Sequence, residues 1–357
     1  MKWTTPQYKK SQVDRTGEVL TSENASEDEK LAAWKILENW RACHSYPMHV
    51  FKKRLKNAAE EIDKRTFTVQ RLKRIPAIVT KLQRRYEGHS PTMNLSQMQD
   101  IGGCRTVLTS VNNVRKLCEE YYLKANLKHK RVGFKDYITY PKRDGYRSIH
   151  LVYEYKSDKK KQEFNKLRIE IQIRTKLQHL WATAIETVGF FTRQALKSNE
   201  GEKEWFDFFR LLGSAFALME GCPLVPNTPL NKTELYSFIK TKERELGVMN
   251  KMLGWAGAMD FFTKEMTTKK KKRVQFFLLE LDILGEKLSI KAYTRAEELK
   301  AIQDYSVLEK RHSGQKDFDV VLVGVDRMDD LKKAYPNYFV DTKEFVENVR
   351  KIVDRIF

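Results

Sequence analysis

The sequence predicts an α+β fold, in which helices cover a mixed β-sheet and a second, smaller α/β domain follows toward the C-terminus. Three observations support this prediction. Residues 148–155 and 167–173 alternate apolar and polar side chains, as strands do. Segments with the apolar spacing of helices lie on both sides of these strands. Beyond residue 274, strand patterns return together with short helices. Strands mixed with covering helices indicate an α+β or α/β core.

The N-terminal part is expected to be mainly helical. Residues 1–25 are polar, and we expect loop or short strand there. Ser26 and the acids after it are typical of a helix start, and apolar residues recur with helical spacing over 31–40. Further helices are expected over 47–62 and from Pro76 to about residue 85, because proline suits the first turn of a helix.

The middle of the chain holds the predicted sheet. Its expected strands are 104–109, 148–155 and 167–173, with helices at 111–123 and 176–187 and an extended or loop segment at 134–140. In the third strand, Ile169 and Ile171 share one face, and Glu170 and Gln172 share the other. The alternation therefore places Glu170 on the polar face of a sheet.

The C-terminal part changes composition at the basic run Lys269–Arg273, for which a hinge, a tRNA contact and a solvated linker all remain open. Before it, helices are expected over 205–220 and 232–252. After it, we expect strands at 274–283, 287–293 and 318–325, and helices at 295–310, 327–334 and 342–355. The predicted domains are a helical lead-in (1–65), a core (66–195), a helical extension with a basic linker (196–273) and a C-terminal domain (274–357).

Composition excludes several classes of protein. The chain has 357 residues and an apolar fraction of 41%, which is enough for packed cores and excludes wholesale disorder. No apolar run reaches the length of a membrane-spanning helix, and the N-terminal residues are not typical of a secretory signal. The four cysteines never form a CxxC pair, so we expect no zinc site, no disulfide framework and a reducing cytoplasm.

The net charge of +20 is concentrated in two segments. Residues 41–90 carry a net +9 and residues 124–176 a net +10, whereas the chain after residue 176 carries only +2. A focused positive charge predicts a polyanionic partner, either nucleotide phosphates or nucleic acid. The alternative is that both segments are simply solvated helix faces.

Two acids on predicted neighbouring strands are candidate metal ligands. Asp100 stands at the entrance of the first strand, before two glycines and Arg105, and Glu170 lies within the third. Two carboxylates of a sheet can hold a Mg²⁺ ion that also binds nucleotide phosphates. Each acid alone is more often a solvated strand residue, but this pair is embedded in a basic chain.

Cations and an aromatic residue flank this pair. Arg71, Lys73, Lys81 and Arg84 are candidate phosphate ligands, and the last two share one face of a helix. Tyr146 follows a glycine in a turn between basic residues, which suits stacking on a base. Simple packing of Tyr146 is an equal alternative.

Three ordered motifs, DIGGCRTVL, KDYITYPKRDGYRSIHLVY and EIQIRTKLQHLWATAIE, resemble the synthetase domain of RelA/SpoT-type nucleotide pyrophosphokinases. The resemblance runs from about Arg71 to Glu186 and implies a nucleotidyltransferase-like core. This family transfers the β,γ-pyrophosphate of ATP to a ribose 3′-hydroxyl. The resemblance therefore implies ATP as the donor and Mg²⁺ as the metal.

The resemblance also implies a role for each matching residue. Asp100 and Glu170 bind Mg²⁺, and Glu170 is the candidate general base for the 3′-hydroxyl. The residues that bind ATP phosphates or flank adenine are Arg71, Lys73, Lys81, Arg84 and Arg105. The residues that hold the acceptor are Lys135, Lys142, Tyr146, Arg147 and His150, with Gln172 and Arg174 completing the polar face.

Three features bear on the acceptor and on regulation. The family's usual Asn-Gly-Tyr is here Asp144-Gly145-Tyr146, and an acid is poorly placed beside a highly phosphorylated GDP or GTP. Residues 39–47 resemble the lead-in of the toxic small alarmone synthetases, some of which modify the 3′-CCA end of tRNA. Tyr335 and Tyr338 form a YxxY element, which on spacing alone is more typical of a turn with two packed tyrosines. The element also resembles the autoinhibitory element in the pseudo-zinc-finger domain of fused, CapRel-type toxin–antitoxin synthetases.

These features support three hypotheses. The first is a self-inhibited toxin of anti-phage defence that pyrophosphorylates tRNA and is released by a phage-encoded trigger protein. The second is a (p)ppGpp or (p)ppApp synthetase with a regulatory C-terminal domain. The third is an inactive nucleotide- or RNA-binding module, against which the Asp100 and Glu170 pair argues.

Overall fold

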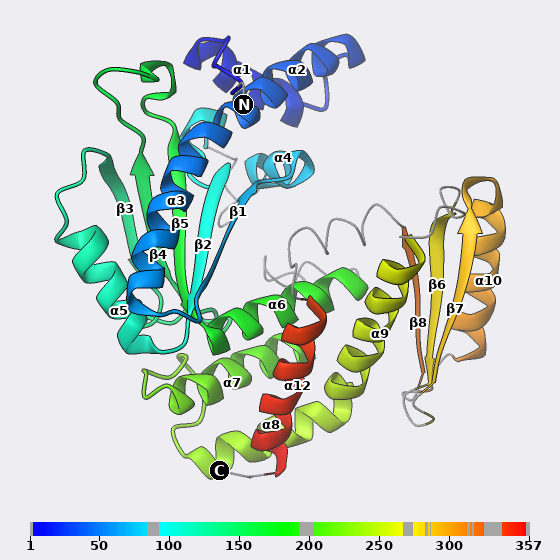
Figure 1. The fold of residues 1–357 in the computed structure, drawn as a ribbon. Coiled ribbons are helices and arrows are strands. Elements are labelled where there is room, and N and C mark those ends of the chain that lie inside the picture. Colours follow the sequence, from blue (N-terminus) through cyan, green and yellow to red (C-terminus); the bar gives the residue numbers. More distant parts are fainter. Residues whose placement is uncertain are drawn as a thin grey trace. The chain divides into compact units, whose positions relative to one another are not determined.

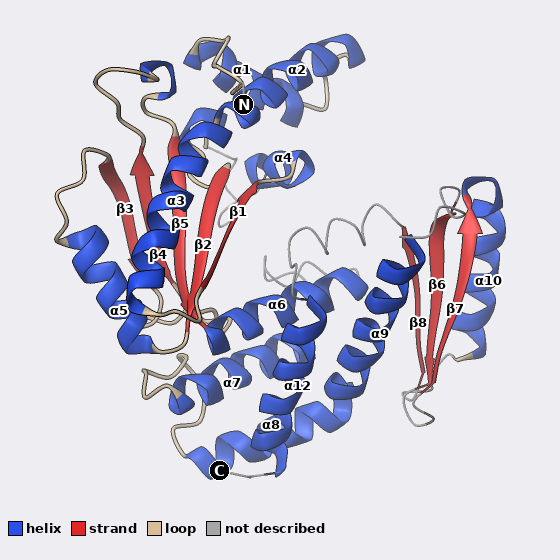
Figure 2. Cartoon of the chain, viewed as in Figure 1, coloured by secondary structure: helices blue, strands red, loops and turns tan. Residues whose placement is uncertain are grey.

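The computed structural model describes residues 3–83, 93–192, 203–266, 274–282, 285, 287–312, 315, 318–324 and 338–354. The chain divides into two compact units (Figures 1 and 2). Unit 1 comprises Met1–Tyr137 and Ser148–Lys176, and unit 2 comprises Ile138–Arg147 and Leu177–Phe357. The predicted domain boundaries stay predictions.

Unit 1 is built on a mixed sheet whose strands follow the order β1-β2-β5-β4-β3. Strands β2 and β5 are parallel, and the other neighbours are antiparallel. Its strands are β1 (Phe67–Leu72), β2 (Gly102–Leu108), β3 (Lys130–Asp136), β4 (Ile149–Glu154) and β5 (Arg168–Thr175). Its helices are α1 (Lys10–Thr21), α2 (Glu27–Cys43), α3 (Ser45–Ile62), α4 (Ile75–Gln83) and α5 (Val111–Cys118), with short turns at Leu95–Gln97, Glu119–Leu123 and Gln162–Phe164.

One face of this sheet is apolar, because apolar and polar residues alternate along β5. Ile169, Ile171 and Ile173 are fully buried, and helix α3 packs on this face beside β1, β2 and β5. Cys104 of β2 donates its thiol hydrogen to the carbonyl of Met48 in α3, at 3.3 Å. The opposite face of the sheet is therefore left to the polar side chains of the same strands.

Helix α1 corrects the expectation that residues 1–25 form loop or short strand. Val13 and Gly17 of this helix are buried, and a Cβ on Gly17 would lie 3.2 Å from the Cβ of Leu95. The helix thus packs closely on residues that are more than 70 positions away in the sequence. Tertiary packing stabilises this helix, whereas its own composition is too polar to predict it.

Strand β1 is an edge strand that the sequence pattern does not reveal. It pairs antiparallel with β2, so that Arg71 lies opposite Gly103. Its residues are mostly half-buried, with no alternation between buried and exposed positions. A period-two pattern needs one buried and one solvated face, and this strand lacks that contrast.

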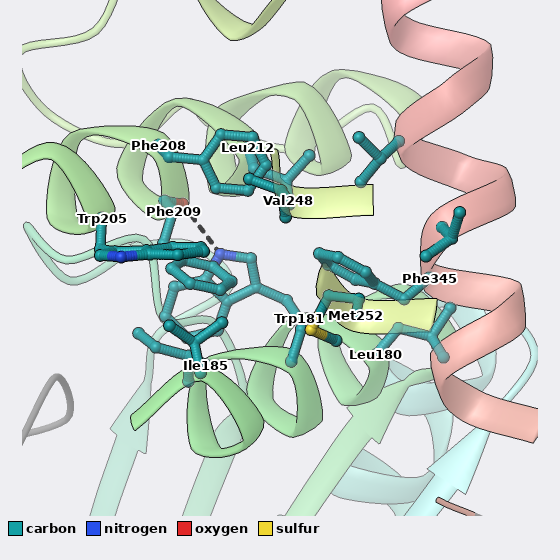
Figure 3. Close-up of a cluster of buried hydrophobic side chains, with 14 of the residues drawn as sticks. Leu180, Trp181, Ile185, Trp205, Phe208, Phe209, Leu212, Val248, Met252 and Phe345 are labelled. Atoms are coloured by element: carbon teal, nitrogen blue, oxygen red, sulfur yellow. Dashed lines mark hydrogen bonds between the residues drawn. The ribbon is translucent and has the colours of Figure 1, made fainter. Parts of the chain in front are cut away.

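Unit 2 contains a helical core and a small sheet. The helices are α6 (Lys176–Phe191), α7 (Lys203–Met219), α8 (Lys232–Leu246), α9 (Val248–Met266), α10 (Glu298–Arg311) and α12 (Tyr338–Asp354). Figure 3 shows aromatic and aliphatic side chains of α6, α7, α9 and α12 filling the core, among them Trp181, Phe209 and Phe345. The helix expected over 232–252 is in fact two helices, because Gly247 adopts a left-handed φ of 62° and ends α8.

The small sheet has the order β7-β6-β8, from β6 (Val274–Asp282), β7 (Lys287–Thr294) and β8 (Phe318–Gly324). Helix α10 covers it, with Leu278, Tyr293 and Ala301 in the core between them. This confirms the expected α/β character of the C-terminal part. Among the described residues, no helix combines the length and the apolar character that crossing a membrane requires.

Candidate functional site

The register of the five-stranded sheet brings predicted site residues from all its strands onto one face. They are Arg71 on β1, Arg105 on β2, Lys135 on β3, His150 on β4, and Glu170, Gln172 and Arg174 on β5. Lys135 pairs with His150, His150 with Gln172, and Gln172 with Arg105. Paired residues share a face, so these side chains form a continuous polar row across the sheet.

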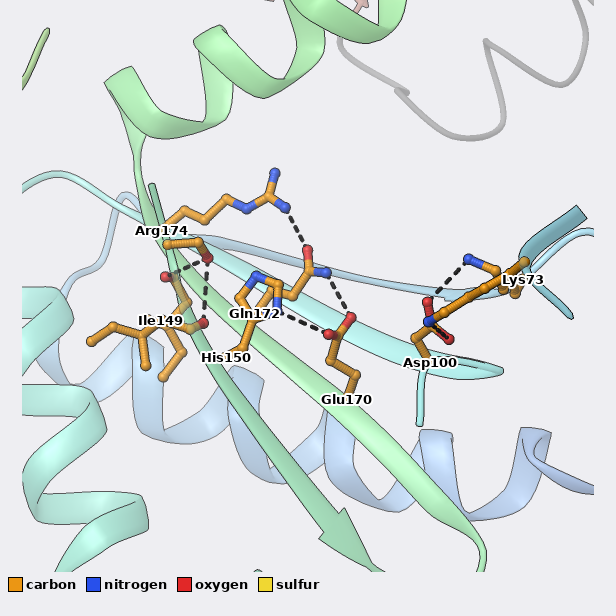
Figure 4. A network of polar contacts seen from close by, with 10 residues as sticks. Lys73, Asp100, Ile149, His150, Glu170, Gln172 and Arg174 are labelled. Atoms are coloured by element: carbon orange, nitrogen blue, oxygen red, sulfur yellow. Dashed lines mark hydrogen bonds and ion pairs between the residues drawn. The ribbon is translucent and has the colours of Figure 1, made fainter. Parts of the chain in front are cut away.

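Glu170 is the centre of a hydrogen-bonded chain of side chains (Figure 4). Nδ1 of His150 lies 2.9 Å from its Oε1, and the amide of Gln172 donates to its Oε2 at 2.7 Å. The guanidinium of Arg174 in turn donates to the amide oxygen of Gln172, at 2.6 Å. The prediction that these three residues of β5 share one polar face is confirmed.

The surroundings of Glu170 keep its carboxylate ionised. Burial alone would raise its pKa, but the charge and hydrogen bond of His150, the amide of Gln172 and the ammonium of Lys81 outweigh this and lower the pKa to about 2. A carboxylate with this pKa carries its negative charge throughout the physiological range. It can therefore serve as a ligand for a cation or as a hydrogen-bond acceptor for a hydroxyl.

Asp100 precedes β2 and holds two lysines from other elements. Its Oδ2 accepts a hydrogen bond from Nζ of Lys73 at 3.0 Å, and its Oδ1 accepts one from Nζ of Lys81 at 2.8 Å. Burial would raise the pKa of Asp100, and the nearby charge of Glu170 adds to this, but the two ammonium groups hold it below its usual value. Glu170 is thus close enough for its charge to influence the ionisation of Asp100.

Two consecutive glycines shape the space beside these acids. A Cβ on Gly102 would lie 2.8 Å from Ile169 and 3.2 Å from His44, so this glycine allows α3 to pack closely on β2. A Cβ on Gly103 would meet only the carbonyl oxygens of Glu170 and Arg71, at 3.8 and 3.9 Å. Gly103 therefore leaves open space between an acid and a cation on the polar face.

The carboxylate pair fits a Mg²⁺ ion. Both groups offer oxygen ligands, and Mg²⁺ is commonly held by one or two carboxylates plus substrate phosphates. Within the described residues, no group of three or more His, Cys, Asp and Glu side chains is arranged to hold a metal ion. Asp100 and Glu170 would therefore need a phosphorylated substrate to complete the coordination.

Three predicted acceptor residues, Lys142, Tyr146 and Arg147, belong to unit 2. Lys142 and Tyr146 contact each other, with the ammonium 5.1 Å from the ring centroid. Tyr146 also packs edge-on against Trp181, at 6.1 Å between centroids. Packing is thus part of what Tyr146 does, and its stacking on a base stays a prediction.

Arg147 is buried and ion-paired, which its sequence position did not suggest. Its guanidinium donates to Glu220 at 2.5 Å, and Gln178 donates to the same carboxylate oxygen at 3.2 Å. Only 2% of the Arg147 side chain is exposed. This network anchors the end of segment Ile138–Arg147 in unit 2, and a role of Arg147 in binding the acceptor stays a prediction. No local signal in the sequence connects Arg147 to Glu220.

Gly145 anchors the same segment through backbone packing. It adopts a φ of 98°, which favours glycine, and a Cβ there would lie 2.7 Å from the carbonyl oxygen of Phe209. The carboxylate of Asp144 accepts a hydrogen bond from the backbone N–H of Tyr146 at 2.9 Å. The acid that departs from the family pattern therefore stabilises the turn itself.

Several predicted residues lie outside the described part of the chain. They are Arg84, Tyr335 and the basic run Lys269–Arg273. Tyr338 is the first residue of α12, but its side chain is also outside the description. The roles expected for these residues stay predictions.

Comparison with known proteins identifies the domain that carries this polar face. Residues 70–190 match the family model of the region found in RelA / SpoT proteins. The chain is similar to two GTP pyrophosphokinases of Bacillus subtilis (strain 168). YjbM is 32% identical over 124 residues, covering 35% of this chain and 56% of YjbM. YwaC is 32% identical over 117 residues, covering 32% of this chain and 54% of YwaC. The chain thus spans about half the length of these relatives.

Solved structures that resemble the chain include small alarmone synthetases of Bacillus subtilis. Synthetase 1 is 23% identical with a TM-score of 0.42, covering 52% of this chain and 92% of that chain. The structure of its complex with the product pppGpp is 24% identical with a TM-score of 0.44, covering 52% of this chain and 94% of that chain. The assignment of the family rests on the sequence matches. Residues 70–190 of this chain carry the region found in RelA / SpoT proteins.

Proposed function

We propose that this protein is an ATP-dependent pyrophosphokinase whose acceptor is the 3′-hydroxyl of the terminal adenosine of tRNA. The single observation that carries the proposal is the Asp100 and Glu170 pair, set among cations on the polar face of a RelA/SpoT-type domain. Relatives with this domain are GTP pyrophosphokinases, which supports the reaction type. A cytoplasmic location is part of the proposal, because ATP and tRNA are found there.

The proposed reaction conserves atoms as follows. The 3′-oxygen of the acceptor forms a bond to the β-phosphorus of ATP, and the bond between that phosphorus and the α,β-bridging oxygen breaks. AMP leaves with the electron pair of the broken bond, and the acceptor gains a pyrophosphate. Such transfers depend on positioning and on neutralisation of charge more than on covalent chemistry by the protein.

The chain's own residues suit these tasks. Lys73 and Lys81 can turn from Asp100 to the phosphates of ATP, and Arg71 and Arg105 lie on the same face to hold the rest of the donor. Mg²⁺ held by Asp100 and Glu170 would neutralise phosphate charge. Each of these cations reduces the repulsion that opposes attack on a polyanion.

Glu170 would orient the acceptor hydroxyl and accept its proton. Its pKa of about 2 makes it a weak base, so we propose that it accepts a hydrogen bond first and takes the proton as the new P–O bond forms. His150 and Gln172 fix the carboxylate from both sides. Their hydrogen bonds keep Glu170 oriented toward the polar face.

The preference for tRNA over a free nucleotide rests on charge. The segments 41–90 and 124–176 carry nearly all of the net charge of +20, which exceeds what one triphosphate with its metal needs. The names of the curated relatives favour GTP as the alternative acceptor, and GDP and AMP are further candidates. Supplying ³²P-labelled ATP with tRNA, GDP or AMP distinguishes these acceptors. Label on none of them, even with the C-terminal region opened, would indicate an inactive binding module.

We also propose that the C-terminal region inhibits the enzyme until a phage-encoded protein binds it. The YxxY element at 335–338 directly precedes and begins α12. Asp341 in the first turn of α12 is buried and contacts Nε2 of His179 in α6, at 3.0 Å. This pair fixes the start of α12 within unit 2, which suits a held element that a partner could release.

A further inference from the structure

A groove of about 560 Å³ runs along helix α3 in unit 1. It is lined by one stripe of this helix and by a tyrosine of the turn Glu119–Leu123. Its lining includes Tyr46, His49, Lys53, Arg54, Asn57 and Tyr121. Helix α3 packs on the apolar face of the sheet, whereas Glu170 lies on the polar face. The groove is therefore a separate site from the carboxylate pair.

The middle of the groove offers cations that protein contacts only partly satisfy. Lys53 is exposed, and Arg54 uses one guanidinium nitrogen to donate to the carbonyl of Tyr121 at 2.9 Å. Nε of Arg54 is buried and has no hydrogen-bond partner among the described residues. The acid at the far end, Glu61, accepts a hydrogen bond from the hydroxyl of Tyr121 at 2.7 Å. The cations thus dominate the free part of the groove.

Aromatic rings close one end of the groove. The ring of Trp3 lies 5.6 Å from that of Tyr46 and 5.5 Å from that of His49. Nζ of Lys161 lies 5.8 Å from the centroid of the Tyr46 ring. Aromatic faces beside cations are the combination that binds single-stranded nucleic acid, because every base can stack on a ring.

Loops next to α3 in the structure carry further basic residues. His129, in the turn before β3, contacts the ring of Phe51 in α3 at 4.7 Å. Burial lowers the pKa of His129 to about 4, and the charges of Lys128 and Arg54 add to this effect. The loop after β4 adds the exposed Lys159 and Lys160. Lys53 and Arg54 of α3 and Lys161 of the loop after β4 thus bring cations from two separate segments to the groove.

We propose that this groove binds the phosphate backbone of an RNA chain. A helix rises about 1.5 Å per residue, so the stripe from Tyr46 to Glu61 is about 22 Å long. One strand of a nucleic-acid helix advances about 3.4 Å per nucleotide, so the stripe spans several phosphates. A single nucleotide would use only part of it. The inference rests on the proposed function in one respect, because the RNA is taken to be the tRNA acceptor. The groove would bind the body of the tRNA, and its 3′ end would lie elsewhere.

Fluorescence anisotropy of labelled tRNA with the full chain tests the proposal without requiring any chemistry. Lys53→Glu and Lys161→Glu change exposed side chains, and circular dichroism checks that both variants fold. We expect each to raise the dissociation constant about tenfold and to reduce the slope of log Kd against log salt by about one. Lys35→Glu, an equal change at an exposed site on α2, should stay within about twofold of wild type.

The outcomes separate this proposal from the proposed function. The proposal that the groove binds RNA would be overturned if Lys53→Glu and Lys161→Glu bind tRNA as tightly as the Lys35→Glu control. Tyr338→Ala protein that binds tRNA through the groove but transfers no label to it would overturn the proposed acceptor and leave the proposed groove function intact. Loss of both tRNA binding and tRNA labelling in Lys53→Glu, with ATP binding unchanged, would support both.

Discussion

Nδ1 of His150 lies 2.9 Å from Oε1 of Glu170, across the antiparallel pair β4 and β5. The contact joins a residue of the predicted acceptor motif to the predicted metal ligand and base. It also helps to keep Glu170 ionised, since the pKa of this carboxyl is lowered to about 2 despite its burial. The polar face of the sheet is thus organised around one charged carboxylate.

Glu170→Gln should abolish pyrophosphate transfer. The change removes the negative charge and the proton acceptor while it keeps the size of the side chain, so we expect the rate to fall by about 10²–10⁴-fold. Steady-state transfer from labelled ATP measures the effect. Glu154→Gln is a matched control on β4, where the carboxylate contacts Arg168 outside the proposed site. Equal rates for the two variants would remove Glu170 from the mechanism.

Glu170 should also make stability depend on pH. Its folded pKa of about 2 lies below the usual value of 4.5, so its contribution is present above pH 4.5 and is lost as the pH falls toward 2. The difference corresponds to about 3 kcal/mol at most. Urea unfolding between pH 6 and pH 3 should show a steeper loss for wild type than for Glu170→Gln. Parallel stability curves would contradict the lowered pKa.

Asp100→Asn should weaken the use of Mg²⁺. The substitution removes one of two proposed carboxylate ligands and leaves Lys73 and Lys81 without their shared anion. We expect the Mg²⁺ concentration for half-maximal transfer to rise about tenfold or more. The exposed Asp158 provides a matched Asp→Asn control in the same unit. An unchanged Mg²⁺ requirement would show that Asp100 serves only to hold the two lysines.

Glu220→Ala should destabilise unit 2 strongly. It leaves the buried guanidinium of Arg147 without its anion, which typically costs about 3–5 kcal/mol. Replacing both partners, as Arg147→Met with Glu220→Leu, should recover most of this loss. Glu245→Ala breaks a surface pair with Lys242 and should cost much less than Glu220→Ala. Denaturant unfolding measures all three.

The double variant also tests whether Arg147 binds the acceptor. If Arg147→Met with Glu220→Leu folds and transfers pyrophosphate at the wild-type rate, the role of Arg147 is structural. A well-folded double variant whose KM for the acceptor rises while its KM for ATP stays constant would assign Arg147 to the acceptor. The structure makes the first outcome the expected one, because Arg147 is almost fully buried.

Tyr338→Ala should increase growth arrest on expression if the C-terminal region inhibits the enzyme. Tyr338→Phe keeps the ring and removes only the hydroxyl, so it should stay close to wild type. Adding Glu170→Gln to Tyr338→Ala should abolish the arrest, which ties it to transfer. Unchanged growth with Tyr338→Ala would leave the YxxY element as packing or as part of a partner-binding surface.

The polar face can be predicted from the sequence alone because it follows from local alternation. In β5 the isoleucines and the polar residues alternate, and this pattern suffices to place Glu170, Gln172 and Arg174 together. Edge strand β1 lacks such a contrast, so Arg71 can be named as a site residue but its strand cannot be predicted. Periodicity reveals an element only where its two faces differ in environment.

The rest of the site depends on contacts between distant parts of the chain. Arg147 meets Glu220 across 73 positions, and Asp100 meets Lys73 and Lys81 across 27 and 19. No local sequence pattern predicts such pairs, because each partner taken alone is indistinguishable from an ordinary charged residue. Helix α1 is unpredictable for a related reason, since its stability comes from packing on Leu95 and not from its own composition.

Transfer of label from [γ-³²P]ATP, with tRNA and GDP supplied together, tests the proposed function most directly. The proposal predicts label on the 3′-terminal adenosine of tRNA, in wild type and more strongly in Tyr338→Ala, and none in Glu170→Gln. Label on GDP with none on tRNA, in wild type and in Tyr338→Ala alike, would contradict it.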